Sequence, residues 1–329
     1  MALAWLAQAN AAPLPEEAQR YLASIRPSAA LQAFLDETID QLSAKDPKIR
    51  HTKLRVALLD LSETPPRLAH YEGDTPVYPA SVVKFVYLMA AYKWQEDGRL
   101  RIDEQLDEQL TEMIYHSSNQ ATQQVFARLT ETQKGGALPP EAYREFRAQR
   151  LLVKQWLESL GITDLHCVNP TYDGNGDLCA RDKQFLQDRT VAGGLPSRDG
   201  EFSNRQAMTA IGTAKLLALL ATDRALSPED SSTVRRRMRR DPRQQPHLKT
   251  RLAGGAARLK DLEVFSKSGT WGPIYADAGI VRHISGAEFV LVVYSDSSPP
   301  YRGSFIADLT ERVAAHVLQG AALREHEGR

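Results

Sequence analysis

A serine and a lysine three residues apart, Ser81 and Lys84, have the types and spacing for nucleophilic chemistry. They follow Pro79 and open the apolar run 82–89, which is typical of the first turn of a buried helix. At this spacing the hydroxyl and the ammonium lie on one helical face. A serine is a weak nucleophile until a neighbouring base takes its proton, and a lysine can be that base when burial lowers its pKa. Taken alone, Ser81 and Lys84 could equally be two incidental polar residues on a buried helix.

Two further polar motifs follow along the chain. Residues 117–119 read Ser-Ser-Asn and interrupt a helical stretch, and residues 267–270 read Lys-Ser-Gly-Thr on a predicted strand. Each motif has a simple structural alternative. Ser117 and Asn119 are residue types that cap helices, and Lys267 and Ser268 suit an edge strand. A catalytic role for the three motifs is excluded only if every one of these structural alternatives is correct.

The elements around the motifs predict a sheet assembled from both ends of the chain. Strands are expected at 54–61, 68–71, 263–269, 275–283 and 288–295, and helices at 16–42, 81–98, 106–115, 120–129, 141–160, 205–222, 228–240 and 301–323. We therefore expect an α/β (α+β) fold with a five-stranded antiparallel sheet, flanking helices and an inserted all-helical lobe. One catalytic domain over 16–329 would consist of an α/β lobe, 16–80 plus 255–329, and a helical lobe, 81–254.

Composition restricts the partners. The 329 residues include 41 Lys+Arg and 41 Asp+Glu, so net charge gives no reason to expect nucleic acid or an acidic membrane surface. No apolar run reaches the roughly 18 residues that a membrane span needs, and no Gly-rich phosphate loop suggests a nucleotide cofactor. Residues 1–15 resemble the end of a signal peptide, with an ordinary helical N-terminus as the alternative. We expect a periplasmic or secreted monomer without metal or cofactor.

Three other features have an uncertain or structural interpretation. Cys167 and Cys179 fit either one disulfide bridge or two free thiols. The segment 173–177, Asp-Gly-Asn-Gly-Asp, resembles the start of a calcium loop but lacks the later glycine and glutamate, so we interpret it as a tight turn. The basic run 235–240 is interpreted as a solvated helix face, with binding of an anionic partner as the alternative.

The three motifs together resemble those of class A β-lactamases and penicillin-binding proteins, in which Ser-x-x-Lys, Ser-Asp-Asn and Lys-Thr-Gly occur in this order. The resemblance extends from about Glu16 to Leu323. It implies a serine hydrolase whose substrate is a small β-lactam or a peptidoglycan-like acyl-D-alanyl compound.

The resemblance also implies a role for each motif residue. Ser81 would attack the substrate carbonyl, Lys84 would accept or relay its proton, and Ser117 would pass a proton towards the leaving nitrogen. Lys267 would polarise Ser117 and attract a substrate carboxylate. The remaining residues would bind substrate: Asn119, Ser268, Gly269 and Thr270, with the N–H groups of Ser81 and Thr270 as the oxyanion hole. Gly269 would leave room for the ligand to approach the strand.

Departures from the family pattern concern the second half of the reaction. Ser118 stands where the family has an acid, and the short segment between Ser81 and Ser117 lacks the wall that carries an aromatic gate. The Glu-x-x-Leu-Asn motif of the deacylating glutamate is absent between 162 and 200. Asn169, Thr171 and Asp173 fall nearest by position, and only Asp173 could act as a base. The alternatives are therefore a D,D-peptidase or esterase with slow deacylation, or a non-catalytic β-lactam sensor.

Overall fold

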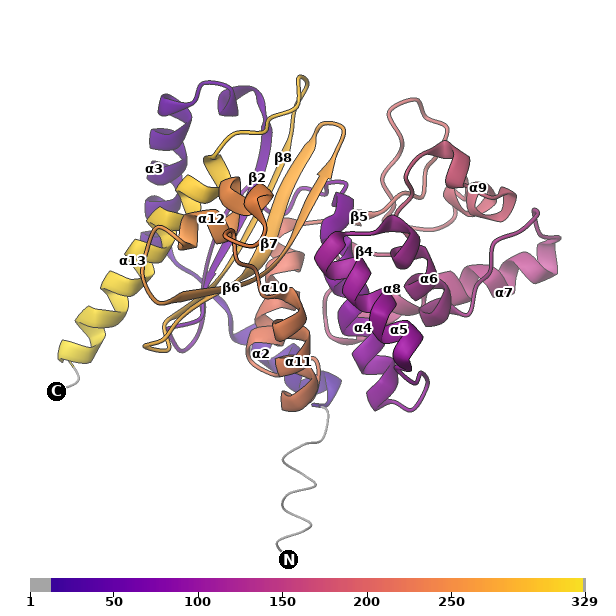
Figure 1. The fold of residues 1–329 in the computed structure, drawn as a ribbon, viewed down its shortest axis with the longest axis horizontal. Coiled ribbons are helices and arrows are strands. Elements are labelled where there is room, and N and C mark those ends of the chain that lie inside the picture. The colour runs from indigo at the N-terminus through magenta and orange to yellow at the C-terminus, as the bar shows by residue number, and fades with distance from the viewer. Residues whose placement is uncertain (1–12, 328–329) are drawn as a thin grey trace, which may run out of the picture.

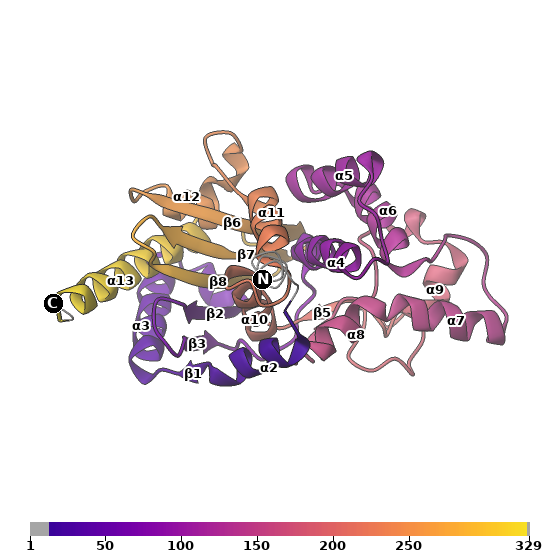
Figure 2. The same cartoon turned by 90° about the horizontal axis from the view of Figure 1, so that it is seen from below.

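The computed structural model describes residues 13–327 and has a six-stranded main sheet in the order β1-β3-β2-β8-β7-β6 (Figures 1 and 2). The strands are β1 (Arg26–Pro27), β2 (Lys53–Asp60), β3 (Arg67–Tyr71), β6 (Leu262–Trp271), β7 (Ile274–His283) and β8 (Glu288–Asp296). The five longer strands pair antiparallel, as predicted, and β2 from the first part of the chain pairs with β8 from the last part. The two-residue β1 adds a parallel edge strand to β3 that was not predicted.

Helices cover both faces of this sheet. Along β2, Val56 and Leu58 belong to one buried cluster, and Ala57 and Leu59 belong to another, because side chains alternate across a strand. The first cluster packs against α3 (Ala29–Lys45), α12 (Leu252–Ala256) and α13 (Phe305–Glu327), and the second against α10 (Ala210–Ala221). Figure 1 shows α3 and α13 on one side of the sheet and the lobe with α4 to α9 on the other. The sheet is therefore the middle layer.

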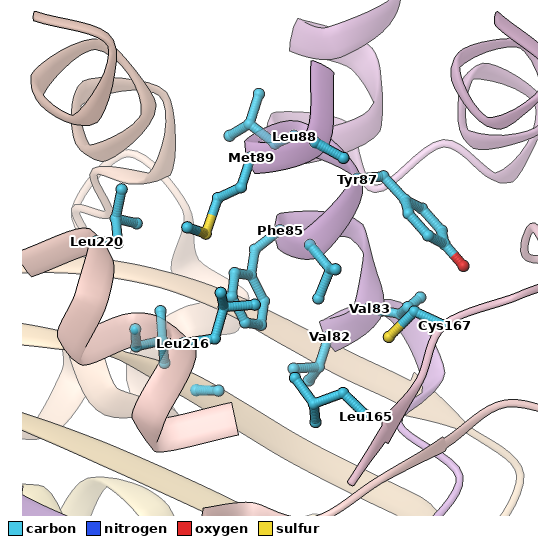
Figure 3. Close-up of a cluster of buried hydrophobic side chains, with 14 of the residues drawn as sticks. Val82, Val83, Phe85, Tyr87, Leu88, Met89, Leu165, Cys167, Leu216 and Leu220 are labelled. Atoms are coloured by element: carbon cyan, nitrogen blue, oxygen red, sulfur yellow. The ribbon is translucent and has the colours of Figure 1, made fainter. Parts of the chain in front are cut away.

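The other helices are α2 (Pro15–Ser24), α4 (Lys84–Glu96), α5 (Glu104–Thr111), α6 (Asn119–Thr130), α7 (Pro140–Arg150), α8 (Leu152–Ser159), α9 (Ala180–Leu186) and α11 (Pro228–Met238). Helix α4 is apolar on every side and buried along most of its length, as expected of a central helix. Figure 3 shows Phe85 and Met89 towards Leu216 and Leu220 of α10, and Tyr87 on the side of Cys167. This packing fixes the start of α4.

Several predictions of detail are wrong. The helix expected over 16–42 is divided between α2 and α3, because Pro27 offers no backbone donor and Ser28 caps α3 by accepting from Leu31 N. The helix expected over 141–160 is α7 followed by α8. The middle of the chain is not all-helical, since β4 (Leu165–His166) pairs with β5 (Ala207–Met208). The predicted signal remnant lies mostly outside the described residues.

Both cysteines are free thiols, so the disulfide alternative is wrong. Cys167 is buried, and burial raises the pKa of its thiol. Residues 173–177 form a turn that ends in the 3₁₀ segment Asn175–Asp177. Within residues 13–327, no cluster of three or more His, Cys, Asp or Glu could hold a metal ion. No helix of that same range is long and apolar enough to cross a membrane.

Candidate active site

Ser81 lies in a 3₁₀ turn, Ala80–Val83, that leads directly into α4, whose first residue is Lys84. In a 3₁₀ turn, residues three apart eclipse one another, so this geometry aligns Ser81 with Lys84 more closely than the predicted α-helical start. Ala80 has a φ of 49°, a left-handed conformation that side chains disfavour. The surrounding core holds this backbone: Val82 and Val83 lie among buried side chains near Leu165 (Figure 3).

Lys84 is fully buried and its ammonium is held by three oxygens of the second motif. Nζ donates to the carbonyl oxygen of Ser117 at 2.6 Å and to Oδ1 of Asn119 at 2.7 Å, and it lies 3.4 Å from Oγ of Ser117. Burial lowers the pKa of Lys84 to about 7, against an opposing effect of the Asp173 carboxylate. A substantial fraction of Lys84 is therefore neutral near neutral pH and able to accept a proton.

The second motif is presented by an irregular helix end. The π-helix Glu112–His116 stops at Ser117, whose φ of 59° is left-handed. The cap of α6 is Ser118, whose Oγ accepts from Ala121 N at 3.1 Å. The structural alternative for this motif therefore applies to Ser118, while Ser117 and Asn119 both contact Lys84. Aspartate caps helices as well as serine does, which explains how Ser118 can replace the acid of the family pattern.

The third motif brings a second buried lysine to Ser117. Nζ of Lys267 donates to Oγ of Ser117 at 3.0 Å and to the carbonyl oxygen of Ser268 at 2.9 Å. Burial lowers the pKa of Lys267 well below its ordinary value, and the nearby Lys84 and Arg240 lower it further, against the buried Asp277. The Ser117 hydroxyl thus lies within reach of two ammonium groups.

Gly269 brings strand β6 against the turn that carries Ser81. A Cβ atom at this position would lie 2.8 Å from the carbonyl oxygen of Pro79 and 3.2 Å from the backbone nitrogen of Ser81. The contact between strand and turn thus already requires a glycine here, and the expectation that it leaves room for the ligand stays a prediction. The backbone of β6 is held directly beside Ser81.

Ser268 and Thr270 lie on either side of Gly269. Ser268 lines a cavity of about 290 Å³ together with Ser117, Lys267 and His247. Oγ1 of Thr270 accepts a 2.6 Å hydrogen bond from Nη2 of Arg251. The position of Thr270 is therefore tied to an arginine that lies outside the three motifs.

Sequence reasoning missed three buried charged residues behind β6: Arg240, Arg251 and Asp277. The guanidinium of Arg251 stacks 3.5 Å above the ring of Tyr275. Arg240 donates to the carbonyl oxygens of Ser266 and Ile114, at 3.1 and 2.7 Å. Arg240 ends the basic run that was interpreted as a solvated helix face, and for this residue that interpretation is wrong. The sequence did offer one signal, the apolar Met238 that interrupts the basic run, and the structure buries this side chain.

Asp173 reaches the second motif from the loop after β4. Its Oδ1 accepts a 2.6 Å hydrogen bond from Nδ2 of Asn119, and its backbone N–H donates to Oδ2 of Asp177 at 2.9 Å. Asn169, another of the three candidates by position, accepts from Arg150 at 2.9 Å and donates to the carbonyl oxygen of Asn204 at 2.9 Å. Asp173 is thus the one of these two that contacts the candidate active site.

A buried arginine anchors this loop. Arg150 forms a 2.9 Å ion pair with Asp182 and donates to the carbonyl oxygen of Val168 at 3.2 Å. Its guanidinium also lies over three phenylalanine rings at 5.1 to 5.3 Å, those of Phe126, Phe146 and Phe185. A buried charge needs such pairing, and the pairing fixes the loop at both ends.

The sheet order, the flanking helices and the convergence of the three motifs at β6 define a β-lactamase/transpeptidase-like fold. Solved structures agree: PBP-A has a TM-score of 0.60 at 20% identity and covers 90% of this chain and 98% of its own. The β-lactamase from Sphaerobacter thermophilus has a TM-score of 0.59 at 16% sequence identity, and the match covers 88% of this chain and 98% of that enzyme. An ancestral class A β-lactamase has a TM-score of 0.59 at 18% sequence identity, and the match covers 85% of this chain and 99% of that enzyme. At these identities the likeness establishes the fold.

The chain belongs to the beta-lactamase enzyme family, which its sequence matches over residues 105–317, more than half of its length. No individually curated protein matches the sequence. The matched range contains Ser117, Asn119 and Lys267 and begins after Ser81 and Lys84. The assignment of the first motif therefore depends on its contacts with the other two. A mutant of PBP-A is described as an acyl-enzyme complex with penicillin-G.

Proposed function

We propose that the protein is a serine hydrolase of class A β-lactamase type, acylated at Ser81 by a β-lactam or an acyl-D-alanyl amide. The observation that carries the proposal is the state of Lys84. Its ammonium is buried, its pKa is lowered to about 7, and it follows Ser81 by one 3₁₀ turn. A base with a pKa near the working pH combines availability with driving force for proton transfer.

In the proposed acylation, Oγ of Ser81 forms a bond to the carbonyl carbon while Lys84 takes the serine proton. The carbon–nitrogen bond then breaks, and Ser117 gives a proton to the leaving nitrogen and regains one from Lys84. The 3.4 Å from Lys84 Nζ and the 3.0 Å from Lys267 Nζ to Ser117 Oγ support this path. The N–H groups of Ser81 and Thr270 would bind the oxyanion, and Asn119, Ser268 and Gly269 would hold the substrate.

Deacylation requires a base that activates water, and Asp173 is the candidate. One of its oxygens accepts from Asn119, and the other has no hydrogen-bond partner within residues 13–327. A carboxylate so placed could accept a proton from a water beside the acyl-enzyme. The missing Glu-x-x-Leu-Asn motif favours a second candidate function, a D,D-peptidase or esterase with slow deacylation. In the limiting case the acyl-enzyme is not hydrolysed at all, and the protein is a β-lactam sensor that is acylated once.

Mass spectrometry and steady-state kinetics with benzylpenicillin and nitrocefin test the proposal. We expect an adduct with the mass of the added β-lactam on Ser81, and its loss together with all hydrolysis in Ser81→Ala. Ser285→Ala, in an exposed turn, is the matched control and retains both. Rapid turnover supports the hydrolase, and a stable adduct supports slow deacylation. If Ser81→Ala keeps full activity and no adduct forms on Ser81, the proposal is wrong.

The proposal includes a monomer in the periplasm or outside the cell, without metal or cofactor. Size-exclusion chromatography with light scattering tests the monomeric state. Cell fractionation of the producing organism tests the location. Activity that persists after dialysis against EDTA is the result expected of an enzyme without a metal.

A further inference from the structure

A large basic cavity of about 1040 Å³ lies where α11 and the chain that follows it approach β6 and α12 (Figure 2). Five arginines and three carboxylates line it: Arg236, Arg237, Arg239, Arg240, Arg243, Asp241, Asp261 and Glu263. Concave surfaces of several hundred cubic ångströms are the usual sites of small ligands. Ser81, Ser117 and Lys267 do not line this cavity, so the chemistry proposed above leaves it without a function.

Arg240 separates the basic cavity from the candidate active site. Its Nη2 donates to the carbonyl oxygen of Ile114 at 2.7 Å and its Nε to that of Ser266 at 3.1 Å, so it bridges the π-helix and β6. Ile114 and Arg240 are among the residues that line both the basic cavity and the cavity of about 290 Å³ beside Ser117. The two cavities therefore share a wall.

The guanidinium of Arg240 is buried without a paired carboxylate. Within residues 13–327, no acidic group forms an ion pair with Arg240, and its hydrogen bonds go to carbonyl oxygens. Asp277, the acid that acts on it electrostatically, also acts on the buried Lys267 and Arg251. One buried carboxylate thus faces three buried cations. Because a buried cation without a counter-ion is unfavourable, an added anion would be stabilised beside Arg240.

Arg236 supplies a second unpaired cation. It is exposed on α11 and contacts only hydroxyl groups, those of Ser232 at 3.0 Å and Thr233 at 2.6 Å, in the part of the chain that the structure describes. The other arginines of the lining are paired with acids: Arg237 with Asp107, Arg239 with Glu263 and Arg243 with Asp241. Among the described residues, Arg236 and Arg240 therefore remain to bind an anion, against the one unpaired lining carboxylate, that of Asp261.

The rest of the lining indicates which anion fits. A phosphate monoester carries close to two negative charges at pH 7 and three acceptor oxygens, which suits two guanidinium groups with donors to spare. Apolar side chains also line the cavity: Ile114, Ala253, Ala256, Leu259, Leu262 and Val264. Inorganic phosphate would leave this apolar surface in contact with water, whereas an organic phosphate would cover it.

We infer that the basic cavity is a second binding site, for a small phosphorylated organic compound. The phosphate binds Arg236 and Arg240, and the organic body covers the apolar lining. For this part of the basic run 235–240, an anionic partner is thus the interpretation that the structure favours. The inference does not depend on acylation of Ser81.

Three probes separate the contributions of charge and of the apolar body: phenyl phosphate, benzoate and inorganic phosphate. Benzoate keeps the ring with a single charge, and inorganic phosphate keeps the charge without the ring. In isothermal titration calorimetry we expect one phenyl phosphate per chain, bound at least about tenfold more tightly than either of the other two. Equal binding of the three probes, or no binding of phenyl phosphate at about 1 mM, overturns the inference.

Two variants place the phosphate. Arg236→Ala changes an exposed side chain and should weaken binding of phenyl phosphate by at least about tenfold. Arg240→Lys keeps the charge but loses the planar fork, so it should weaken binding as well. Arg20→Ala is the matched control, because Arg20 is an exposed arginine on α2, outside the cavity lining, and it should leave the affinity unchanged.

Lys267→Met distinguishes the basic cavity from the active site. Lys267 lines only the cavity beside Ser117, so this variant should keep the affinity for phenyl phosphate within about threefold. Loss of binding in Lys267→Met with full affinity in Arg236→Ala would place the anion in the active site and overturn the inference. Full affinity in both Arg236→Ala and Arg240→Lys would overturn it too. Acylation of Ser81 by benzylpenicillin, measured in parallel, tests the proposed function independently of these results.

Discussion

Lys267 donates a 3.0 Å hydrogen bond to the hydroxyl of Ser117, and this contact joins strand β6 to the end of the π-helix Glu112–His116. Lys84 approaches the same hydroxyl at 3.4 Å from α4. Burial disfavours the charged form of each lysine and lowers both pKa values. The site therefore holds two amines that lose their protons more readily than surface lysines, on either side of one hydroxyl. That arrangement suits proton transfer between a nucleophile and a leaving group.

The rate of acylation should depend on pH through Lys84. Only the neutral amine accepts the Ser81 proton, and the pKa of Lys84 is about 7. The second-order rate constant for acylation should therefore rise as the pH passes through about 7 and level off above it. The Asp173 carboxylate raises this pKa by stabilising the ammonium. Asp173→Asn should consequently move the rising limb to lower pH, as measured by stopped-flow acylation with nitrocefin.

The control for this prediction is Glu108→Gln, which removes an exposed carboxylate on α5. Its pH profile should match that of the unmodified protein. A flat profile between pH 5 and 9 would exclude Lys84 as the base. An unchanged midpoint in Asp173→Asn would show that the two groups are not electrostatically coupled. Loss of turnover in Asp173→Asn with acylation retained would identify Asp173 as the deacylation base.

Gly269→Ala should damage both packing and acylation. The new methyl group would lie 2.8 Å from the carbonyl oxygen of Pro79, so β6 and the Ser81 turn must move apart. Overpacking of this kind costs about 1–3 kcal/mol of unfolding free energy. Because the oxyanion hole is proposed to span the turn and the strand, acylation should fall by at least about tenfold. Urea denaturation and acylation kinetics measure the two effects.

Gly136→Ala is the matched control, because a Cβ atom there meets no atom within 4 Å. It should leave the acylation rate unchanged. It should also not lower the unfolding free energy, because alanine restricts the unfolded chain more than glycine does. If Gly269→Ala is as stable and as active as Gly136→Ala, the close contact between strand and turn is not required.

The sequence allowed the sheet and the three motifs to be predicted, because their signals are local. The strands that became β2, β7 and β8 are nearly continuous apolar runs, as buried strands must be when helices cover both faces. The motif residues were recognisable because a serine, a lysine and an asparagine interrupt apolar segments. Their mutual contacts then follow from the fold that those segments form.

Other parts of the site carry no local signal. Arg251 reaches Thr270 and Tyr275 only because α12 packs behind β6, and Asp277 is buried by the same packing. The pairing of β4 with β5 joins segments about forty residues apart, each two residues long, so periodicity cannot reveal it. The division of the helix expected over 141–160 at Leu151 likewise has no proline or glycine to mark it.

Ser118 should tolerate the acid that the family pattern has at this position. Its hydroxyl accepts from Ala121 N and caps α6, a task that aspartate performs equally well. Ser118→Asp should therefore keep the unfolding free energy within about 0.5 kcal/mol and retain acylation, whereas Ser118→Ala should lose about 1 kcal/mol. Thermal denaturation and nitrocefin kinetics separate the two. A loss of stability in Ser118→Asp as large as in Ser118→Ala would contradict the capping explanation.

Arg150 should be essential for the loop that carries Asp173. Arg150→Met leaves Asp182 buried without its 2.9 Å ion pair, and breaking one partner of a buried pair costs about 3–5 kcal/mol. Arg144→Met, which removes an exposed pair with Glu141, is the control and should cost less than about 1 kcal/mol. Urea denaturation measures both.

The double variant Arg150→Met/Asp182→Leu separates the ion pair from the other contacts of Arg150. If the cost comes from the unpaired Asp182 charge, the double variant recovers part of the lost stability. It should not recover turnover, because Arg150 also binds Asn169 and the carbonyl oxygen of Val168, which hold the loop beside Asn119. Full turnover in the double variant would show that the loop keeps Asp173 in place without Arg150. If Arg150→Met, Arg144→Met and the double variant all have the same unfolding free energy, the buried pair contributes nothing to the stability of the fold.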